Sequence, residues 1–169
     1  MKKAGWALLL VVVAVGERVW WDLGPNIELV TMAMILAASY LGKNWAMGVV
    51  LVSMGISDLM LGNSNIWLFT WSGFLIPVLW MNKEPGVVKG VGMGLGANLF
   101  FYAWTNFGVW LLDSWGMYSN DVSGLINAYI NGLPFLKLQV FSTLLFLPAA
   151  LVVMEVWRTR LWQQSMISR

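Results

Sequence analysis

The chain has 169 residues, of which 59% are hydrophobic and only 11% are charged, with a net charge of +2. Soluble domains carry about 25% charged residues, so this composition excludes an ordinary soluble protein and predicts an integral membrane protein. The absence of Cys and His argues against metal, haem and iron–sulfur sites and against thiol or histidine catalysis. No basic cluster is dense enough for nucleic acid, and the sequence indicates no particular cofactor.

The apolar segments predict an all-α protein with six transmembrane helices in one bundle, which forms a single domain over residues 1–169. The expected helices span about residues 4–21, 27–41, 45–61, 66–81, 87–112 and 134–157. The first has the basic start and short apolar run of a signal peptide, but its extension to Trp20 and Trp21 favours a retained helix. Pro134 is expected to open the last helix, after an outer cap segment at 113–131 that lies across the mouth of the bundle.

The charged residues sort by sign along these segments. With the amino terminus in the cytoplasm, the inner side receives Lys2, Lys3, Lys43, Lys83, Lys89, Arg158, Arg160 and Arg169. Only Arg18 and Lys137 fall outside. The positive-inside rule therefore predicts a multi-pass protein of the cytoplasmic (inner) membrane of a prokaryote, with both termini in the cytoplasm.

The fifth segment has two distinct halves. Gly86, Gly90, Gly94 and Asn98 recur every four residues, so one face has almost no side chains and favours close helix packing. Tyr102 and Asn106 continue the same row as a polar stripe. Lipid cannot satisfy polar groups, so the stripe must face protein or water, and both interhelical hydrogen bonding and a ligand site fit it.

Asp58 is the only carboxylate inside an otherwise apolar predicted helix, where a charge is costly unless a partner offsets it. Candidate partners are Ser53, Ser57, Lys137 and polar donors on the fifth helix; alternatively, Asp58 caps the turn that follows. Pairing of Asp58 with Asp113 for acid–base chemistry has no spacing to require it, so we expect a protein that is not an enzyme.

The outer half gathers the candidate ligand-binding residues, which are Glu28, Asp58, Asn98, Tyr102, Asn106 and Asp113. Such a set favours a small polar or cationic ligand with an apolar body. The second helix also carries Ala33-x-x-x-Ala37, a small-residue face suited, like Gly90 and Gly94, to helix packing or to docking of a partner.

Several short stretches resemble a small family of prokaryotic membrane proteins whose function is unknown. They are Pro25-Asn26, Ser57-Asp58-Leu59-Met60-Leu61-Gly62, Thr105-Asn106-Phe107-Gly108-Val109-Trp110, Gly124-Leu125, Tyr129 and Leu133-Pro134-Phe135. They cover about residues 25–150 and imply no activity.

More distantly, six short helices, an Ala-x-x-x-Ala face and an Asp-Leu pair late in the third helix resemble the substrate-binding components of energy-coupling-factor vitamin transporters. That resemblance implies a ligand held in the outer half and small-residue faces that dock a membrane coupling protein. Here Ala33 and Ala37 lie in the second helix, whereas the motif of that family usually lies in the first.

Two functions follow as hypotheses. The first is a solute-binding component of an uptake system that needs an energising partner, since no Gly-x-x-x-x-Gly-Lys motif for nucleotide occurs. The second is a structural or accessory subunit of a larger membrane complex. In either case the expected partners are the lipid bilayer and other membrane subunits.

Overall fold

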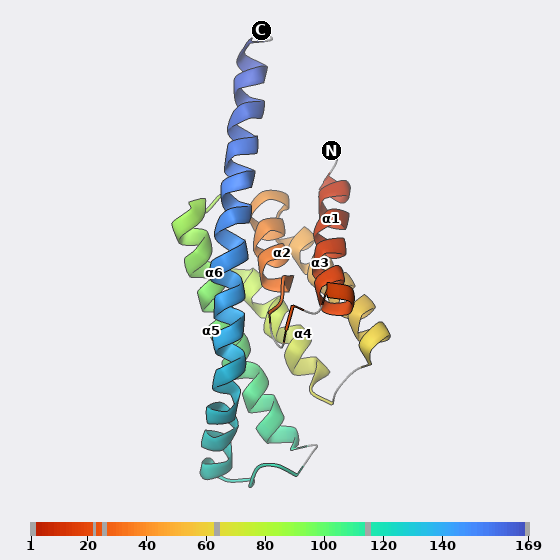
Figure 1. Ribbon diagram of the computed structural model, residues 1–169, viewed down its shortest axis with the longest axis vertical. Helices are drawn as coiled ribbons and strands as arrows, with labels where there is room; N and C mark the ends of the chain where they lie inside the picture. The colour runs from red at the N-terminus through yellow and green to blue at the C-terminus, as the bar shows by residue number, and fades with distance from the viewer. Residues whose placement is uncertain (1–2, 22, 25–26, 63–64, 114–115, 168–169) are drawn as a thin grey trace.

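The computed structural model describes residues 3–21, 23–24, 27–62, 65–113 and 116–167, with side chains described as far as Thr159. Every regular element within these ranges is helical, which confirms the prediction of an all-α protein (Figure 1). The α-helices are α1 (Lys3–Gly16), α2 (Val30–Leu36), α3 (Lys43–Leu61), α4 (Trp67–Leu75), α5 (Gly86–Leu112) and α6 (Val122–Ile167). Three continue into a short segment of different pitch, namely the π-helical η1 (Glu17–Trp21) and η2 (Ala37–Leu41) and the 3₁₀-helical η3 (Ile76–Trp80).

Three helical stretches are long and apolar enough to cross a membrane, as the composition leads one to expect of a membrane protein. They are Lys3–Trp21, Lys43–Leu61 and Val122–Thr159. Two more stretches, Val30–Leu41 and Trp67–Trp80, are apolar but shorter.

The last helix corrects the sequence-based expectation. Helix α6 begins at Val122, so Pro134 lies inside the helix and most of the expected cap segment is helical. Asp121 stabilises this start, because its Oδ1 accepts hydrogen bonds from the Gly124 amide at 2.7 Å and the Ser119 hydroxyl at 2.8 Å. These two hydrogen bonds lower the pKa of Asp121 below its ordinary value, and the bond from the Gly124 amide has the larger effect. A proline removes only one helical N–H, and membrane helices tolerate that loss.

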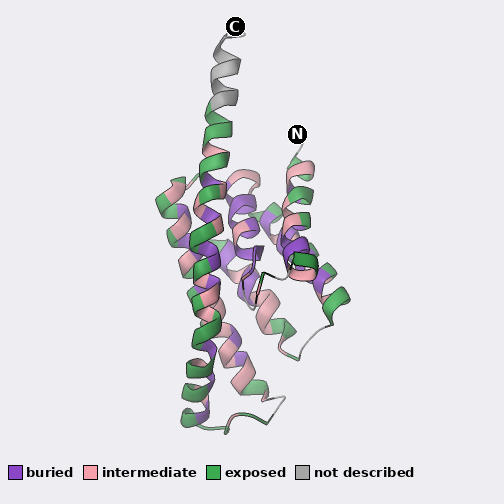
Figure 2. Cartoon of the chain, viewed as in Figure 1, coloured by how far each residue is buried: buried purple, intermediate pink, exposed green. Residues whose placement is uncertain are grey.

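Helix α2 lies at the centre of the core. Its residues Val30, Ala33, Met34 and Ile35 are fully buried, and other buried core residues come from α1, α3, α4, α5 and the middle of α6 (Figure 2). Residues 152–159 of α6 are mostly exposed instead. The short helix α2 thus forms the centre of the core, and longer helices surround it.

Helices α5 and α6 run antiparallel and side by side (Figure 1). Glycines on α5 permit this approach, since a Cβ at Gly90 would lie 2.6 Å from Cδ1 of Leu151, and one at Gly94 would lie 2.7 Å from Cδ2 of Leu147. Near the other end of α5, Gly108 faces the ring of Phe69 on α4. Helices α4 and α6 therefore pack closely against the backbone of α5.

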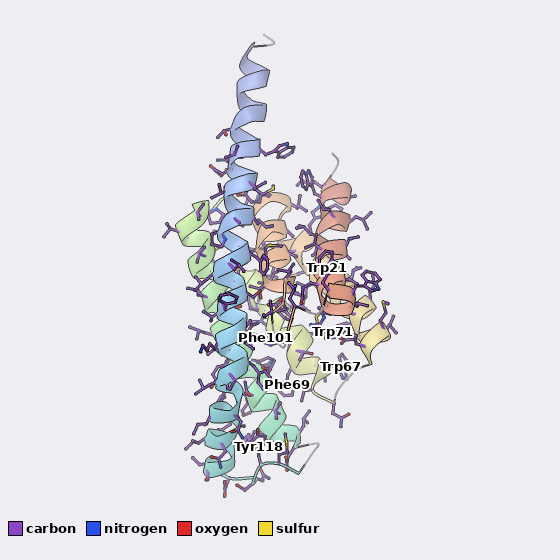
Figure 3. All side chains as sticks on the ribbon, viewed as in Figure 1. Trp21, Trp67, Phe69, Trp71, Phe101 and Tyr118 are labelled. Carbon is purple, nitrogen blue, oxygen red and sulfur yellow. The ribbon has the colours of Figure 1, made fainter. Side chains whose placement is uncertain are left out.

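Aromatic rings fill the space between α4 and α5. The ring centroids of Phe74 and Phe101 are 4.4 Å apart, and those of Phe69 and Trp104 are 5.1 Å apart. Figure 3 shows Phe69 and Phe101 in this region, with Tyr118 in the loop that joins α5 to α6. Such pairs give the two helices a rigid contact, and this contact forms one wall of the site described next.

Candidate functional site

The Asp58 carboxylate lies in a polar cluster between α3, η1 and α4. Its Oδ2 accepts a hydrogen bond from Nε1 of Trp71 at 2.7 Å, and its Oδ1 lies 3.4 Å from Nη2 of Arg18. Arg18 also donates to the Ser57 hydroxyl at 2.9 Å. The partners of Asp58 are therefore Arg18 and Trp71, neither of which was among the candidates drawn from the sequence. Both oxygens of the Asp58 carboxylate therefore interact with side chains of the protein itself.

A second polar cluster is buried among α2, α5 and α6, and Asn98 is at its centre. This side chain has no exposed surface, and its Nδ2 donates to the Thr143 hydroxyl at 2.8 Å and to the Gln139 carbonyl at 3.2 Å. Its Oδ1 lies 3.4 Å from the Thr31 hydroxyl. Asn98 thus links three helices by hydrogen bonds.

Glu28 belongs to the same cluster and is only 8% exposed. One carboxylate oxygen accepts the Thr31 amide hydrogen at 3.0 Å, in the first turn of α2, and the other accepts the Thr31 hydroxyl at 2.6 Å. Gln139 on α6 donates to Glu28 Oε1 at 3.4 Å, and the Ser142 hydroxyl donates to the Glu28 carbonyl at 2.8 Å. A negative charge at the start of a helix also interacts favourably with the helix dipole.

Three other predicted site residues lie toward the loop between α5 and α6. Tyr102 donates its hydroxyl to the Tyr129 carbonyl at 2.6 Å, and Asn106 donates to the Tyr102 carbonyl on its own helix at 2.8 Å. Asp113 ends α5 in the left-handed conformation (φ 34°), and its Oδ1 accepts the amide of Met117 at 2.9 Å. Tyr102 and Asp113 therefore hold the backbone in place.

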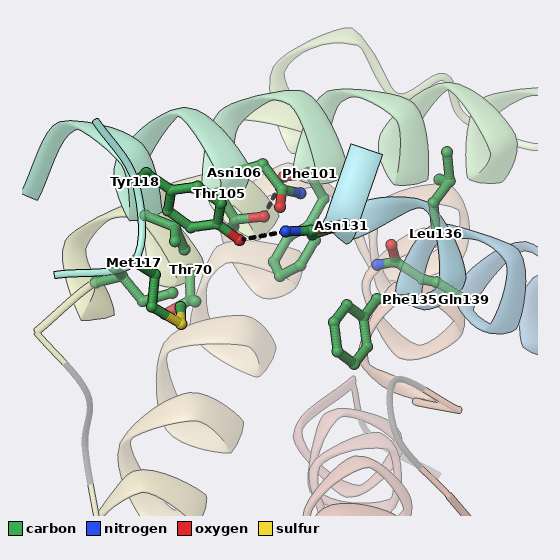
Figure 4. A pocket seen from close by; sticks show the side chains of 13 residues that line it. Thr70, Phe101, Thr105, Asn106, Met117, Tyr118, Asn131, Phe135, Leu136 and Gln139 are labelled. Atoms are coloured by element: carbon green, nitrogen blue, oxygen red, sulfur yellow. Dashed lines mark hydrogen bonds between the residues drawn. The ribbon is translucent and has the colours of Figure 1, made fainter. Parts of the chain in front are cut away.

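A pocket of about 530 Å³ opens between α4, α5, α6 and the loop that precedes α6 (Figure 4). Its polar lining consists of Thr70, Thr105, Asn106, Tyr118, Asn131 and Gln139, and its apolar lining of Ile66, Phe101, Val109, Met117, Phe135 and Leu136. Gly132 completes the wall, and a Cβ there would collide with the Asn106 amide. None of these described lining residues is acidic or basic.

The structure separates the six predicted ligand residues into three groups. Asn106 lines the pocket, Glu28 and Asn98 lie behind Gln139 in the buried cluster, and Asp58, Tyr102 and Asp113 are not in the lining. The polar residues that the sequence-based hypothesis omitted are Thr70, Tyr118, Asn131 and Gln139. Asn131 and Gln139 could have been found from their spacing. Asn131, Phe135 and Gln139 follow one another at intervals of four residues, which places them on one face of a helix.

The small residues proposed for packing or docking lie inside the protomer. Ala33 and Ala37 are fully buried, so they offer no exposed face to a partner. Gly90 and Gly94 are covered by α6. Within the described part of the chain, His, Cys, Asp and Glu form no group of three that could hold a metal ion.

Fold and site together define an all-helical protein with helices able to cross a membrane and an open, neutral pocket at one end of the α4–α5–α6 group. Comparison with protein families matches residues 1–165 to a family described as "Family of unknown function (DUF6580)", and the chain belongs to this family. Searches of curated proteins and of solved structures found no match.

Proposed function

We propose that the protein is a solute-binding component of an uptake system in the inner membrane of a prokaryote, with both termini in the cytoplasm. Three helices of spanning length and the sorted charges support this location. The described start of α1 and the end of α6 also point toward the same end of the molecule, and the loop between α5 and α6 lies at the opposite end (Figure 1).

The observation that carries the proposal is the pocket between α4, α5 and α6. Its volume of about 530 Å³ suits a small molecule. Aromatic and aliphatic walls with a few converging amide and hydroxyl groups are the usual lining of a small-molecule site. In the proposed orientation the pocket belongs to the outer half, where a solute arrives.

The same lining favours binding rather than catalysis. The amides of Asn106, Asn131 and Gln139 give and accept hydrogen bonds but do not transfer protons near neutral pH. The proposed role therefore needs an energising partner, because the sequence carries no phosphate-binding Gly-x-x-x-x-Gly-Lys motif.

Native mass spectrometry of the purified protein tests this proposal. We expect the wild-type protein to retain a small molecule as a mass adduct and Asn131→Leu to lose it, because the leucine removes a polar group and places apolar bulk in the pocket. Asn127→Leu is the matched control, since Asn127 is exposed one turn earlier on α6 and does not line the pocket. A wild-type protein without any adduct, or an adduct that survives in Asn131→Leu, would contradict the proposal.

The second candidate is an accessory subunit of a larger membrane complex. The observation that favours it is α6, which exposes Val152, Val153 and Val156 and whose C-terminal end projects beyond the other helices (Figure 1). A transmembrane helix of another subunit would cover these side chains. A large, stable complex in mild detergent, with no small-molecule adduct, would support this candidate over the first.

A further inference from the structure

Gln139 connects the pocket to the buried cluster. Its side chain is 4% exposed and lines the pocket, and its Nε2 donates to Glu28 Oε1. The amide cannot be turned the other way, because its carbonyl would then face a carboxylate. Its Oε1 is consequently directed away from Glu28, and no described residue donates a hydrogen bond to it. Gln139 therefore brings to the pocket lining a side-chain acceptor to which no described residue donates.

Glu28 places a negative charge directly behind this acceptor. Its oxygens contact Thr31 and Gln139, and none of the described basic side chains forms an ion pair with it. Lys137 is exposed and lies two positions before Gln139 on α6, which puts it on the far face of that helix. Asp58, by contrast, has Arg18 as its partner. Glu28 is thus a buried acidic side chain that forms no ion pair with any described basic residue.

We propose that the pocket selects a protonated amine with an aromatic or aliphatic body, held by Gln139 Oε1 and the Glu28 charge behind it. This inference rests on the proposed function and names the class of solute. The ammonium group would donate to Gln139 Oε1, and Gln139 Nε2 would continue to donate to Glu28. An amide polarised by a carboxylate on its nitrogen side is a stronger acceptor on its oxygen side.

The rest of the lining fits the same ligand. The described lining residues are neutral, and their contacts reach two acidic side chains: Glu28 through Gln139, and Asp113 through the amides of Met117 and Tyr118. In surroundings of low dielectric the attraction of Glu28 for a cation is stronger than in water. Phe101, Tyr118 and Phe135 contribute aromatic rings, which pack against an apolar body and attract cations through their faces.

Three probes with the same phenylethyl frame test the charge preference: 2-phenylethylamine, 2-phenylethanol and phenylacetate. They are cationic, neutral and anionic at pH 7. Binding to the purified full-length protein is measured by saturation-transfer NMR, with detergent micelles alone and Asn131→Leu as backgrounds. We expect the amine to bind at least tenfold more tightly than the alcohol and the acid to show no binding above background.

The isosteric variant Glu28→Gln removes the charge and keeps an oxygen for the Thr31 amide. We expect it to bind the amine no more tightly than the alcohol. If the variant does not fold, the three probes on the wild-type protein still decide the matter. Equal binding of amine and alcohol, preference for the acid, or no binding by any probe would overturn the inference.

The two experiments distinguish rejection of the amine preference from rejection of the solute-binding role. A mass adduct that depends on Asn131, together with equal binding of amine and alcohol, would retain the solute-binding role and reject the amine. Absence of the adduct from the purified protein would reject the role itself.

Discussion

Asp58 and Glu28 are two acidic side chains in largely apolar surroundings, and their neighbours differ. Asp58 has Arg18 and Trp71 as partners, whereas Glu28 is held by Thr31 and Gln139 and no described cation pairs with it. A partner that offsets the charge makes Asp58 part of the structure. Glu28 has no such partner among the described residues.

Substitution of Asp58 should therefore affect stability rather than binding. Asp58→Ala leaves the Trp71 indole N–H without its acceptor and the Arg18 guanidinium with only the Ser57 hydroxyl, and we expect a loss of about 1–3 kcal/mol in the free energy of unfolding. Thermal unfolding in detergent measures this loss as a lower melting temperature. Asp58→Asn, which keeps an oxygen for Trp71, should lose less. Loss of the mass adduct from folded Asp58→Asn protein would show that Asp58 does contact the ligand.

For single residues, the sequence indicated which positions are polar but not which residues they contact. Of the polar stripe on α5, Asn98 and Tyr102 donate hydrogen bonds to α6, and Asn106 lines the pocket. Gln139 was missed because it contacts Glu28 across 111 positions of the chain. Only the packing of α6 against α2 creates that contact, and no periodicity within either segment reports it.

Among the elements, α5 shows how glycine position decides packing. Gly94 faces α6, where an added Cβ would lie 2.7 Å from Leu147 and 2.9 Å from Thr143. Gly96 is exposed, and nothing lies within 4 Å of its added Cβ. The two glycines are two positions apart and thus lie on different faces of one helix.

This difference provides a matched pair of variants. Gly94→Ala should lower the free energy of unfolding by about 1–3 kcal/mol, because the added methyl group overpacks a tight helix contact. Gly96→Ala adds the same atom in open space and should leave the melting temperature unchanged or slightly raised, since alanine favours the helix. A comparison of the two melting temperatures checks both statements. Equal losses would contradict the prediction, because alanine itself favours the helix and only Gly94 has a close contact with α6.

The predicted start of α6 at Pro134 was wrong, although the sequence contains a capping residue at the observed start. Pro134 suggested a helix start, but the observed start at Val122 follows Asp121, an acidic residue well suited to accept the Gly124 amide. A capping signal upstream therefore outweighed the proline. In water an interior proline costs about 3 kcal/mol in a helix, and the packing of this stretch against α5, through Tyr129 and Gly132, opposes that cost.

On the scale of the whole molecule, the orientation in the membrane stays a prediction that labelling can test. The chain contains no cysteine, so a single introduced cysteine reports one position without background. Lys83→Cys and Asn120→Cys both lie at exposed sites in opposite connecting segments. In intact cells a membrane-impermeant maleimide should label Asn120→Cys and should label Lys83→Cys only after the membrane is opened. The reverse pattern would invert the proposed topology and place the pocket on the cytoplasmic side.

Helix α6 has 46 residues and therefore measures about 69 Å at about 1.5 Å per residue, whereas a bilayer with its headgroups is about 40–45 Å thick. A single helix thus carries Asn131 and Gln139 at the pocket and Arg158 near its other end. Between these two ends, α6 packs closely against Gly90 and Gly94 of α5. A tilt at the pocket would be transmitted to the far end except where the helix bends, and Pro134 and Pro148 are the two interior positions at which bending is easiest.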